Sequence, residues 1–185
     1  MAKALPIKLF FLSLIIISLT SCSSRKNPVI YYNEFDFSQV KNYSFYSSDS
    51  TFFDSQSLTH SQRNRIELAI EKSLNAQSFN YTTPESADII VTYHWVKNSP
   101  IDYQAYNKSI LFCQHCLKAN TWQKVKYDWV VYPGGLIIDL VDPKKNRSVW
   151  RSIHPLKFKT KDNSMKRNEK LTYAVEAMLS QYPTN

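Results

Sequence analysis

The feature that most constrains the fold is a predicted β-hairpin in the last third of the chain. Two apolar runs of strand length, Gly135–Asp142 and Ser148–His154, are separated by a short polar turn at Pro143–Arg147. Antiparallel strands joined by so short a turn pair directly with each other, and we expect Asp142 to pair with Ser148. The chain is therefore expected to contain a sheet built around this hairpin.

Further strands and two helices are predicted from apolar periodicity. Alternation over Val40–Ser47 and Ala87–Val96 predicts strands, and Trp122–Tyr132 is a candidate for another. Apolar residues recur at three- and four-residue steps in two other segments, which predicts amphipathic helices. The two apolar stripes are Ile66, Ala69, Ile70 and Leu74, and Leu171, Ala174, Val175, Met178, Leu179 and Tyr182.

These elements predict an α+β domain over residues 35–185. Each helix has one apolar stripe, which it must bury against a sheet face. We therefore expect a two-layer sandwich, with a mostly antiparallel sheet and the two helices packed on one face. The chain has the length of one domain of this kind.

Glycine content and motif content argue against enzymatic activity. The chain has two glycines, Gly134 and Gly135, and they are adjacent. A glycine-rich phosphate-binding loop therefore cannot form. Neither a G-x-S-x-G nucleophile motif nor an H-E-x-x-H zinc motif occurs in the sequence. We expect no enzyme, no cofactor and no metal.

The N-terminal residues indicate where the protein is located. Lys3 and Lys8 accompany an apolar segment, Leu9–Leu19, that has signal-peptide length. The sequence Leu19-Thr20-Ser21-Cys22 then resembles a bacterial lipoprotein signal. The resemblance implies that residues 1–21 are removed and that the thiol and new amino group of Cys22 are acylated.

The same resemblance implies a location and a domain organisation. Ser23 after the cysteine favours the outer membrane, with the domain facing the periplasm. Residues 22–34 are expected to form the lipidated cysteine and a tether. Two or more acyl chains make membrane anchoring durable, whereas one chain does not.

The charge of the chain restricts its expected partners. The sequence has 23 Lys and Arg against 15 Asp and Glu, and removal of Lys3 and Lys8 lowers the formal net charge from +8 to +6. An envelope protein of this charge is expected to meet anionic lipid headgroups or anionic envelope polymers, and not nucleic acid. A basic run near the C-terminus consists of Lys157, Lys159, Lys161, Lys166, Arg167 and Lys170.

Cys113 and Cys116 frame His115 in a Cys-x-x-Cys motif. Exported thiols meet oxidising conditions, so a disulfide between the two cysteines is the expectation. Thiol-redox chemistry is one alternative, and zinc bound by the two cysteines and His115 is another. The candidates for a fourth zinc ligand are His60, His94 and His154.

A polar trio is predicted on the sheet face that points away from the helices. The hairpin register places Asp139 opposite Arg151. His94 lies on the more polar face of Ala87–Val96, so neighbouring strands would bring all three residues into one surface patch. Such a patch could bind an anionic ligand, or it could be a solvated face with a weak exposed ion pair.

Four segments follow one another in a recognisable order along the chain. They are Asp36–Phe45, Ala87–His94, Gly135–Asp142 followed by Val149–Arg151, and a final helix with Ala174, Val175, Leu179, Tyr182 and Pro183. Together they resemble a bacterial lipoprotein family known only as a domain of unknown function, over residues 35–183. The resemblance implies an α+β fold and an envelope location, and it implies no activity.

The expected function is therefore that of a lipid-anchored, non-enzymatic binding module in the bacterial cell envelope. Its partner would be an envelope protein or an anionic polymer. Cys22 would carry the anchor, and His94, Asp139 and Arg151 would form the surface site. The alternative is a thiol-redox or metal-binding envelope protein that uses Cys113 and Cys116.

Overall fold

The predicted hairpin is present and forms the centre of the sheet. Strand β5 (Gly135–Asp142) pairs with strand β6 (Arg147–Pro155) in antiparallel register. Asp142 pairs with Arg147, one residue earlier than expected, and an irregularity after Leu140 corrects the register. As a result Asp139 lies opposite Arg151, as predicted.

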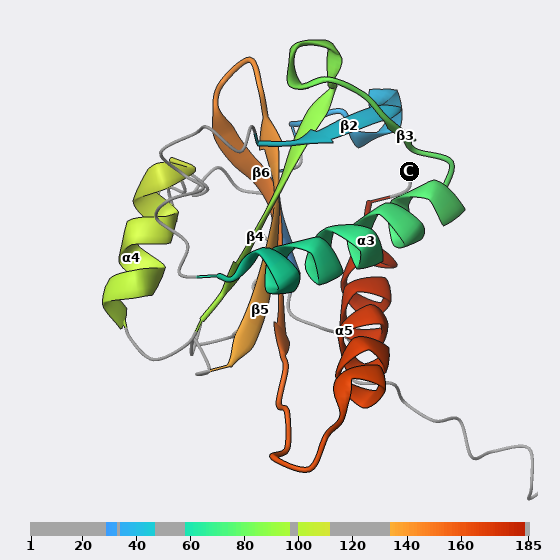
Figure 1. Cartoon of the computed structure of the whole chain (residues 1–185). Coiled ribbons are helices and arrows are strands. Elements are labelled where there is room, and N and C mark those ends of the chain that lie inside the picture. The colour runs from blue at the N-terminus through green and yellow to red at the C-terminus, as the bar shows by residue number, and fades with distance from the viewer. Residues whose placement is uncertain (1–28, 33, 47–57, 97–99, 112–133, 184–185) are drawn as a thin grey trace, which may run out of the picture.

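The structure is a computed structural model that describes residues 29–32, 34–46, 58–96, 100–111 and 134–183 (Figure 1). Within these ranges the fold is α+β, with six strands in one sheet. The other strands are β1 (Val29–Tyr31), β2 (Asn42–Phe45), β3 (Asn80–Tyr81) and β4 (Ile89–Trp95). The helices are α3 (His60–Ala76), α4 (Pro100–Ser109) and α5 (Ser164–Leu179), with short 3-10 turns η1 (Phe37–Gln39) and η2 (Pro84–Ser86).

The sheet is mixed, so the prediction of a mostly antiparallel sheet is wrong. The strand order is β1-β6-β5-β4-β2-β3. Neighbours from β1 to β4 are antiparallel, whereas β2 is parallel to both β4 and β3. The cause is α3, which lies in the chain between β2 and β4. A helical crossover brings the chain back to the end of the sheet where it started, and the next strand runs in the same direction.

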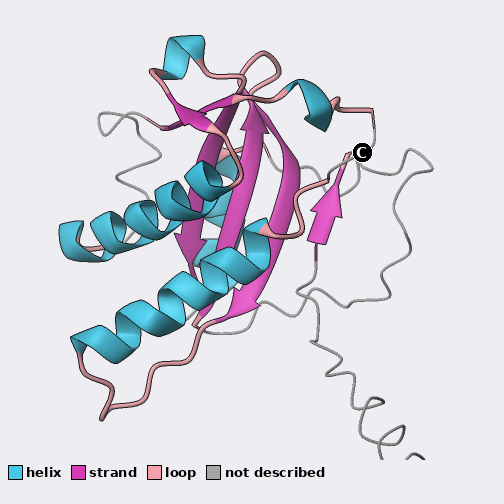
Figure 2. Cartoon of the chain, turned by 90° about the vertical axis from the view of Figure 1, so that its right-hand side faces the viewer, coloured by secondary structure: helices cyan, strands magenta, loops and turns pink. Residues whose placement is uncertain are grey.

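The layers of the molecule are visible in Figure 1, where the sheet is seen almost edge-on. Helices α3 and α5 cover one face, as predicted, and Figure 2 shows them side by side across it. Helix α4 lies on the opposite face, so the expected two-layer sandwich has a third layer. The sequence of α4 gave no broad apolar stripe, because the face it turns to the sheet carries polar as well as apolar side chains.

The larger core lies between the sheet and helices α3 and α5. It contains the predicted helix stripes together with Ile89, Val91 and Tyr93 of β4 and Leu136, Ile138 and Leu140 of β5. Both helices have well-formed starts. Thr59 and Gln62 form a capping box at α3, and Asn163 accepts a hydrogen bond from the Lys166 N–H at α5.

The folded part of the chain begins earlier than predicted. Residues Val29–Tyr31 were expected to lie in a tether, but they form the edge strand β1 and pair with β6. Val29 lies opposite Ser152, and Tyr31 lies opposite Trp150. Three residues carry too little alternation for a strand to be recognised from sequence.

Candidate functional site

The predicted Asp139–Arg151 pair exists, but it is buried and not exposed. The Nε atom of Arg151 donates to both carboxylate oxygens of Asp139, at 2.9 and 3.1 Å. The two residues are 0% and 1% exposed. The predicted surface position is therefore wrong, because helix α4 covers this part of the sheet.

Helix α4 supplies polar partners to both members of the pair. The Tyr106 hydroxyl donates to Oδ2 of Asp139 at 2.7 Å. Nη1 of Arg151 donates to the Tyr103 hydroxyl at 3.1 Å and to Oδ1 of Asn107 at 2.7 Å. The ion pair is thus the point at which α4 is fixed to the sheet.

Neighbouring strands complete this polar network. The Ser148 hydroxyl donates to Oδ1 of Asp139 at 2.6 Å, and Oγ1 of Thr92 lies 2.9 Å from the Tyr106 hydroxyl oxygen. The ring of His94 stacks on the ring of Tyr106, with centroids 4.7 Å apart. The structure therefore brings His94, Asp139 and Arg151 together on one sheet face, with Tyr106 between the histidine and the ion pair. Tyr106 was not among the predicted site residues.

Burial and charge act on the two titratable groups that flank Asp139. Burial raises the pKa of Tyr106 well above its ordinary value, and the Asp139 carboxylate adds to the effect. Burial lowers the pKa of Arg151, but the same carboxylate outweighs it and the net pKa is raised. The network therefore holds a charged arginine and a protonated tyrosine, a combination that orders α4 and offers solvent no exposed acid or base.

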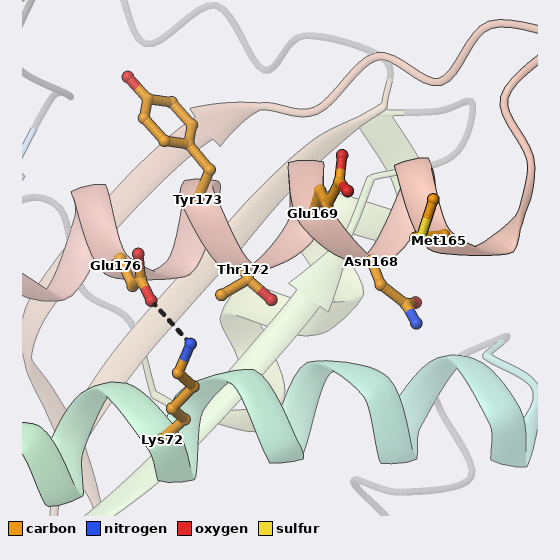
Figure 3. Close-up of a pocket in the computed structure, with 7 residues that line it drawn as sticks. All are labelled: Lys72, Met165, Asn168, Glu169, Thr172, Tyr173 and Glu176. Carbon is orange, nitrogen blue, oxygen red and sulfur yellow. Dashed lines mark ion pairs between the residues drawn. The ribbon is translucent and has the colours of Figure 1, made fainter.

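A different surface is open to solvent, on the outer side of α5 and the adjoining part of α3 (Figure 3). We call this hollow of about 690 Å³ the helical surface, and its lining residues are Lys72, Met165, Asn168, Glu169, Thr172, Tyr173 and Glu176. Figure 3 shows Lys72 and Glu176 reaching toward each other, Asn168 pointing toward α3, and Tyr173 pointing away from it.

The helical surface combines exposed apolar groups with charges of both signs. Met165 is 67% exposed and Tyr173 is 66% exposed. Nζ of Lys72 lies 3.6 Å from Oε1 of Glu176, and both side chains are at least half exposed. Sequence reasoning missed this surface. The available signal was the position of Met165 and Tyr173, which fall outside the buried stripe of α5.

A comparison with protein families matches residues 29–184 to the model described as a domain of unknown function, DUF4136. The chain belongs to this family. The family resemblance that the sequence predicted for residues 35–183 is thereby confirmed. No curated protein matches the chain.

Solved structures resemble the chain at low sequence identity. A DUF4136 family protein from Bacteroides thetaiotaomicron VPI-5482 is 14% identical, with a TM-score of 0.53, and the match covers 83% of this chain and 93% of that one. The PelC dodecamer from Paraburkholderia phytofirmans is 10% identical, with a TM-score of 0.46 and coverage of 85% and 96%. A PDZ domain protein from Parabacteroides distasonis ATCC 8503 is 15% identical, with a TM-score of 0.45 and coverage of 85% and 35%. At these identities the likeness to the family member from Bacteroides shows the fold alone.

The three cysteines with predicted roles, Cys22, Cys113 and Cys116, lie outside the described residues. The three histidines considered as a fourth zinc ligand lie in different parts of the fold. His60 is exposed at the start of α3, His94 lies beneath α4, and His154 contacts the ring of Tyr173 on the other sheet face. In the part of the chain that the structure describes, no group of three or more potential ligands is arranged to hold a metal ion.

The membrane anchor predicted from the sequence is Cys22, which lies outside the described residues. Among the described helices, none combines the length and apolar character needed to cross a bilayer. The candidate strand Trp122–Tyr132 also lies outside the described residues.

Proposed function

We propose that this chain is the periplasm-facing domain of a bacterial outer-membrane lipoprotein, anchored by fatty acids on Cys22. Its role is to bind an envelope partner, and it has no enzymatic activity. The Leu19–Cys22 signal after an apolar segment supports the anchor.

The observation that carries the binding role is the contrast between the buried polar network and the exposed helical surface. Asp139, Arg151 and Tyr106 are turned inward, and Asp139 accepts hydrogen bonds from both of the others, so the three residues serve the fold. Met165 and Tyr173 are turned outward on a helix whose apolar stripe is already buried. Tyrosine and methionine are enriched at protein interfaces.

The chemistry of this surface favours a protein over an anionic polymer. Lys72, Glu169 and Glu176 place both signs of charge around the apolar groups. A polyanion would be repelled by the carboxylates, whereas a protein can present complementary charges of both signs. The envelope protein is therefore the proposed partner, and the anionic polymer is the alternative occupant.

A photo-crosslinking residue at position 173 tests the binding role in intact cells. We expect a discrete protein adduct at position 173 that weakens when Met165→Glu is added. The matched control is the same crosslinker at Gln104, an exposed position on α4. Equal adducts at both positions, or adducts at neither, would refute a protein-binding helical surface.

The anchor is tested separately by labelling with a radioactive fatty acid. The wild-type chain should incorporate the label and pellet with membranes, and Cys22→Ala should do neither. A labelled, membrane-bound Cys22→Ala variant would show that the lipoprotein assignment is wrong.

The alternative function uses Cys113 and Cys116, whose spacing is compatible with a disulfide, a redox pair or part of a zinc site. Thiol titration before and after reduction distinguishes these cases. An inert disulfide, which we expect, leaves the binding role as the function. A disulfide that exchanges readily, or stoichiometric zinc in the purified protein, would favour the alternative.

A further inference from the structure

The loop between β6 and α5, together with the first turns of α5, concentrates positive charge. We call this region the basic end, and it consists of Lys157, Lys159, Lys161, Lys166, Arg167 and Lys170. All are exposed except Lys170, which is partly buried. The acidic residues in the same stretch are Asp162, which pairs with Lys170, and Glu169 on α5. Cations therefore dominate this end of the molecule.

A buried carboxylate ties the loop of the basic end to helix α5. Asp162 accepts hydrogen bonds from the Lys159 N–H at 2.8 Å and from the Lys170 ammonium group. The Lys170 hydrogen bond, followed by that from Lys159, holds the pKa of Asp162 below its ordinary value. These two hydrogen bonds join the loop to α5, and Lys157, Lys159 and Lys161 are exposed.

Aromatic contacts attach the same loop to the sheet. Phe158 packs against Trp95 of β4, with ring centroids 5.1 Å apart. The guanidinium of Arg167 lies 5.8 Å from the Phe158 ring centroid, and its Nε donates to the main-chain oxygen of Asp162. The basic end is therefore an ordered surface and not a loose charged tail.

The register of β1 places its first residue, Val29, toward the same end of the molecule. Strand β6 runs toward Pro155 and leads directly into the basic loop. Because β1 is antiparallel to β6 and Val29 lies opposite Ser152, β1 begins at the end of the sheet where β6 finishes. Figure 1 shows the β6–α5 loop at the bottom of the molecule and the β5–β6 turn at the top.

The distance from the anchor to the sheet is short. Cys22 precedes Val29 by seven positions. Seven extended residues span at most about 25 Å. A lipid on Cys22 would therefore hold this end of the domain close to the bilayer, and the opposite end would point away from it.

The opposite end of the sheet has mixed charge. Lys144 and Lys145 lie in the β5–β6 turn, where the Lys144 N–H donates to Oδ1 of Asp142 and the Lys144 charge acts on Asp88. The hydrogen bond from the Lys41 N–H is the main cause that lowers the pKa of Asp88, and the charge of Lys144 adds to it. Among the described residues, cations thus outnumber carboxylates more clearly at the basic end than at the opposite end of the sheet.

We infer that the basic end is a membrane-docking surface that binds the headgroups of anionic phospholipids and fixes the orientation of the domain on the bilayer. The inference rests on the proposed lipid anchor for its geometry. Lysines near an anionic surface each add to binding, and the attraction falls off within a Debye length.

Vesicle sedimentation tests the docking surface without the anchor. The chain from residue 22 onward, carrying Cys22→Ser, keeps every residue of the described fold. We expect it to bind vesicles in which about a third of the lipid is phosphatidylglycerol, and to bind pure phosphatidylcholine vesicles much more weakly. Raising the ionic strength from about 0.05 M to about 0.5 M should release it.

Two charge reversals of equal size distinguish a localised surface from net charge. Lys157→Glu with Lys161→Glu should lower the vesicle partition coefficient by about tenfold or more. Lys144→Glu with Lys145→Glu changes the net charge equally at the opposite end and should have little effect. Equal losses for the two pairs, or no binding by the unchanged chain, would overturn the docking surface.

Lysine acetylation footprinting tests the orientation in the lipidated full-length protein. In vesicles that contain phosphatidylglycerol, Lys157, Lys159 and Lys161 should be protected several-fold relative to Lys144 and Lys145, and the protection should disappear in detergent. Uniform labelling would overturn the inferred orientation.

Failure of the anchor and failure of the docking surface have different signatures. Fatty acid labelling at Cys22 could fail while the two charge-reversed variants still differ in vesicle binding. In that case the lipoprotein proposal is wrong and the lipid-binding surface stands. If labelling succeeds and the two charge reversals behave alike, the anchor stands and the docking surface is wrong.

Discussion

The two faces of the sheet are covered in physically different ways. Helices α3 and α5 cover one face through a continuous apolar core, in which Ile66, Val91 and Val175 are typical members. Helix α4 covers the other face over a smaller apolar cluster, and its polar side chains bond to Asp139 and Arg151. The same strands therefore present one face that is stabilised by its buried apolar area and one face that depends on specific hydrogen bonds and an ion pair.

This difference determines how each face responds to a change. Apolar burial adds up over many contacts, each worth little alone, so the loss of one methyl group is tolerated. A buried charge depends on all its partners, because a partly satisfied polar network is costlier than an apolar core. We expect graded losses on the α3/α5 face and abrupt losses on the α4 face.

The largest effect is expected from a charge placed in the apolar core. Val91→Asp buries a carboxylate with no partner and should cost about 5 kcal/mol or more, enough to unfold the domain. Val91→Ala, the matched control, should lose only part of that stability. Urea unfolding measures both. A folded Val91→Asp variant would show that the α3/α5 face is not the main core.

Breaking the buried ion pair should give the next largest effect. Asp139→Asn leaves the Arg151 guanidinium buried without its carboxylate and should cost about 3–5 kcal/mol in urea unfolding. An exposed pair, as the sequence suggested, would cost at most about 1 kcal/mol. A loss in that lower range would mean that α4 does not cover the pair in solution.

Replacing both members of the pair sharpens the same comparison. Asp139→Leu combined with Arg151→Met removes both charges, and we expect the double variant to be more stable than Asp139→Asn alone. If its urea midpoint is lower than that of the single variant, the ion pair contributes net stability that an apolar pair cannot replace.

Removal of the Tyr106 hydroxyl, which joins α4 to the ion pair, should give a smaller loss of stability, and that loss should depend on pH. Tyr106→Phe removes one buried hydrogen bond to Asp139 and should cost about 1–3 kcal/mol near neutral pH. Burial and the Asp139 charge raise the pKa of Tyr106, so the folded state keeps a proton that the unfolded state loses above about pH 10. Stability is therefore full below that pH and falls as the pH rises further.

The alkaline comparison isolates Tyr106 from other tyrosines. Burial also raises the pKa of Tyr43 to about 12 and raises that of Tyr93 on the opposite face. The wild type should thus lose stability in alkali for several reasons, and Tyr106→Phe should lose less per pH unit. Parallel stability curves for the two proteins would show that Tyr106 is not buried beside a charge.

The smallest effect is expected on the outer surface. Lys72→Ala removes the pair with Glu176, in which both side chains are largely exposed, and should change stability by at most about 1 kcal/mol. The same variant should still affect partner capture at the helical surface. A larger loss of stability would place this pair among the structural contacts of the α3/α5 face.

The α3/α5 face could be predicted from sequence because its side chains are periodic. The stripe Ile66, Ala69, Ile70 and Leu74 and the alternation from Ile89 to Tyr93 each follow the geometry of one element. The hairpin follows from an equally local rule. What local rules cannot supply is strand direction, so the parallel placement of β2 beside β4 was missed.

The α4 face could be predicted only in part. Cross-strand register placed Asp139 opposite Arg151, because a register is a local count along two strands. Its burial depends on α4, whose inward residues Tyr103, Tyr106 and Ile110 mix hydroxyl groups with apolar surface. Their spacing of three and four residues was the available signal. Without that signal, a buried charged pair looks the same in the sequence as an exposed one, because the exposure of a residue depends on the whole fold.

Strand β1 has a consequence for the order in which the chain folds. It is the first described element in the chain, but its partner strand is β6. Val29 therefore cannot pair until Ser152 is available. About 120 residues are made in between, so this contact is among the most non-local in the fold, and contacts of that kind form slowly. The hairpin and the α3 crossover need no such wait. The N-terminal edge of the sheet is therefore the last part to close, because β1 cannot pair until β6 is in place.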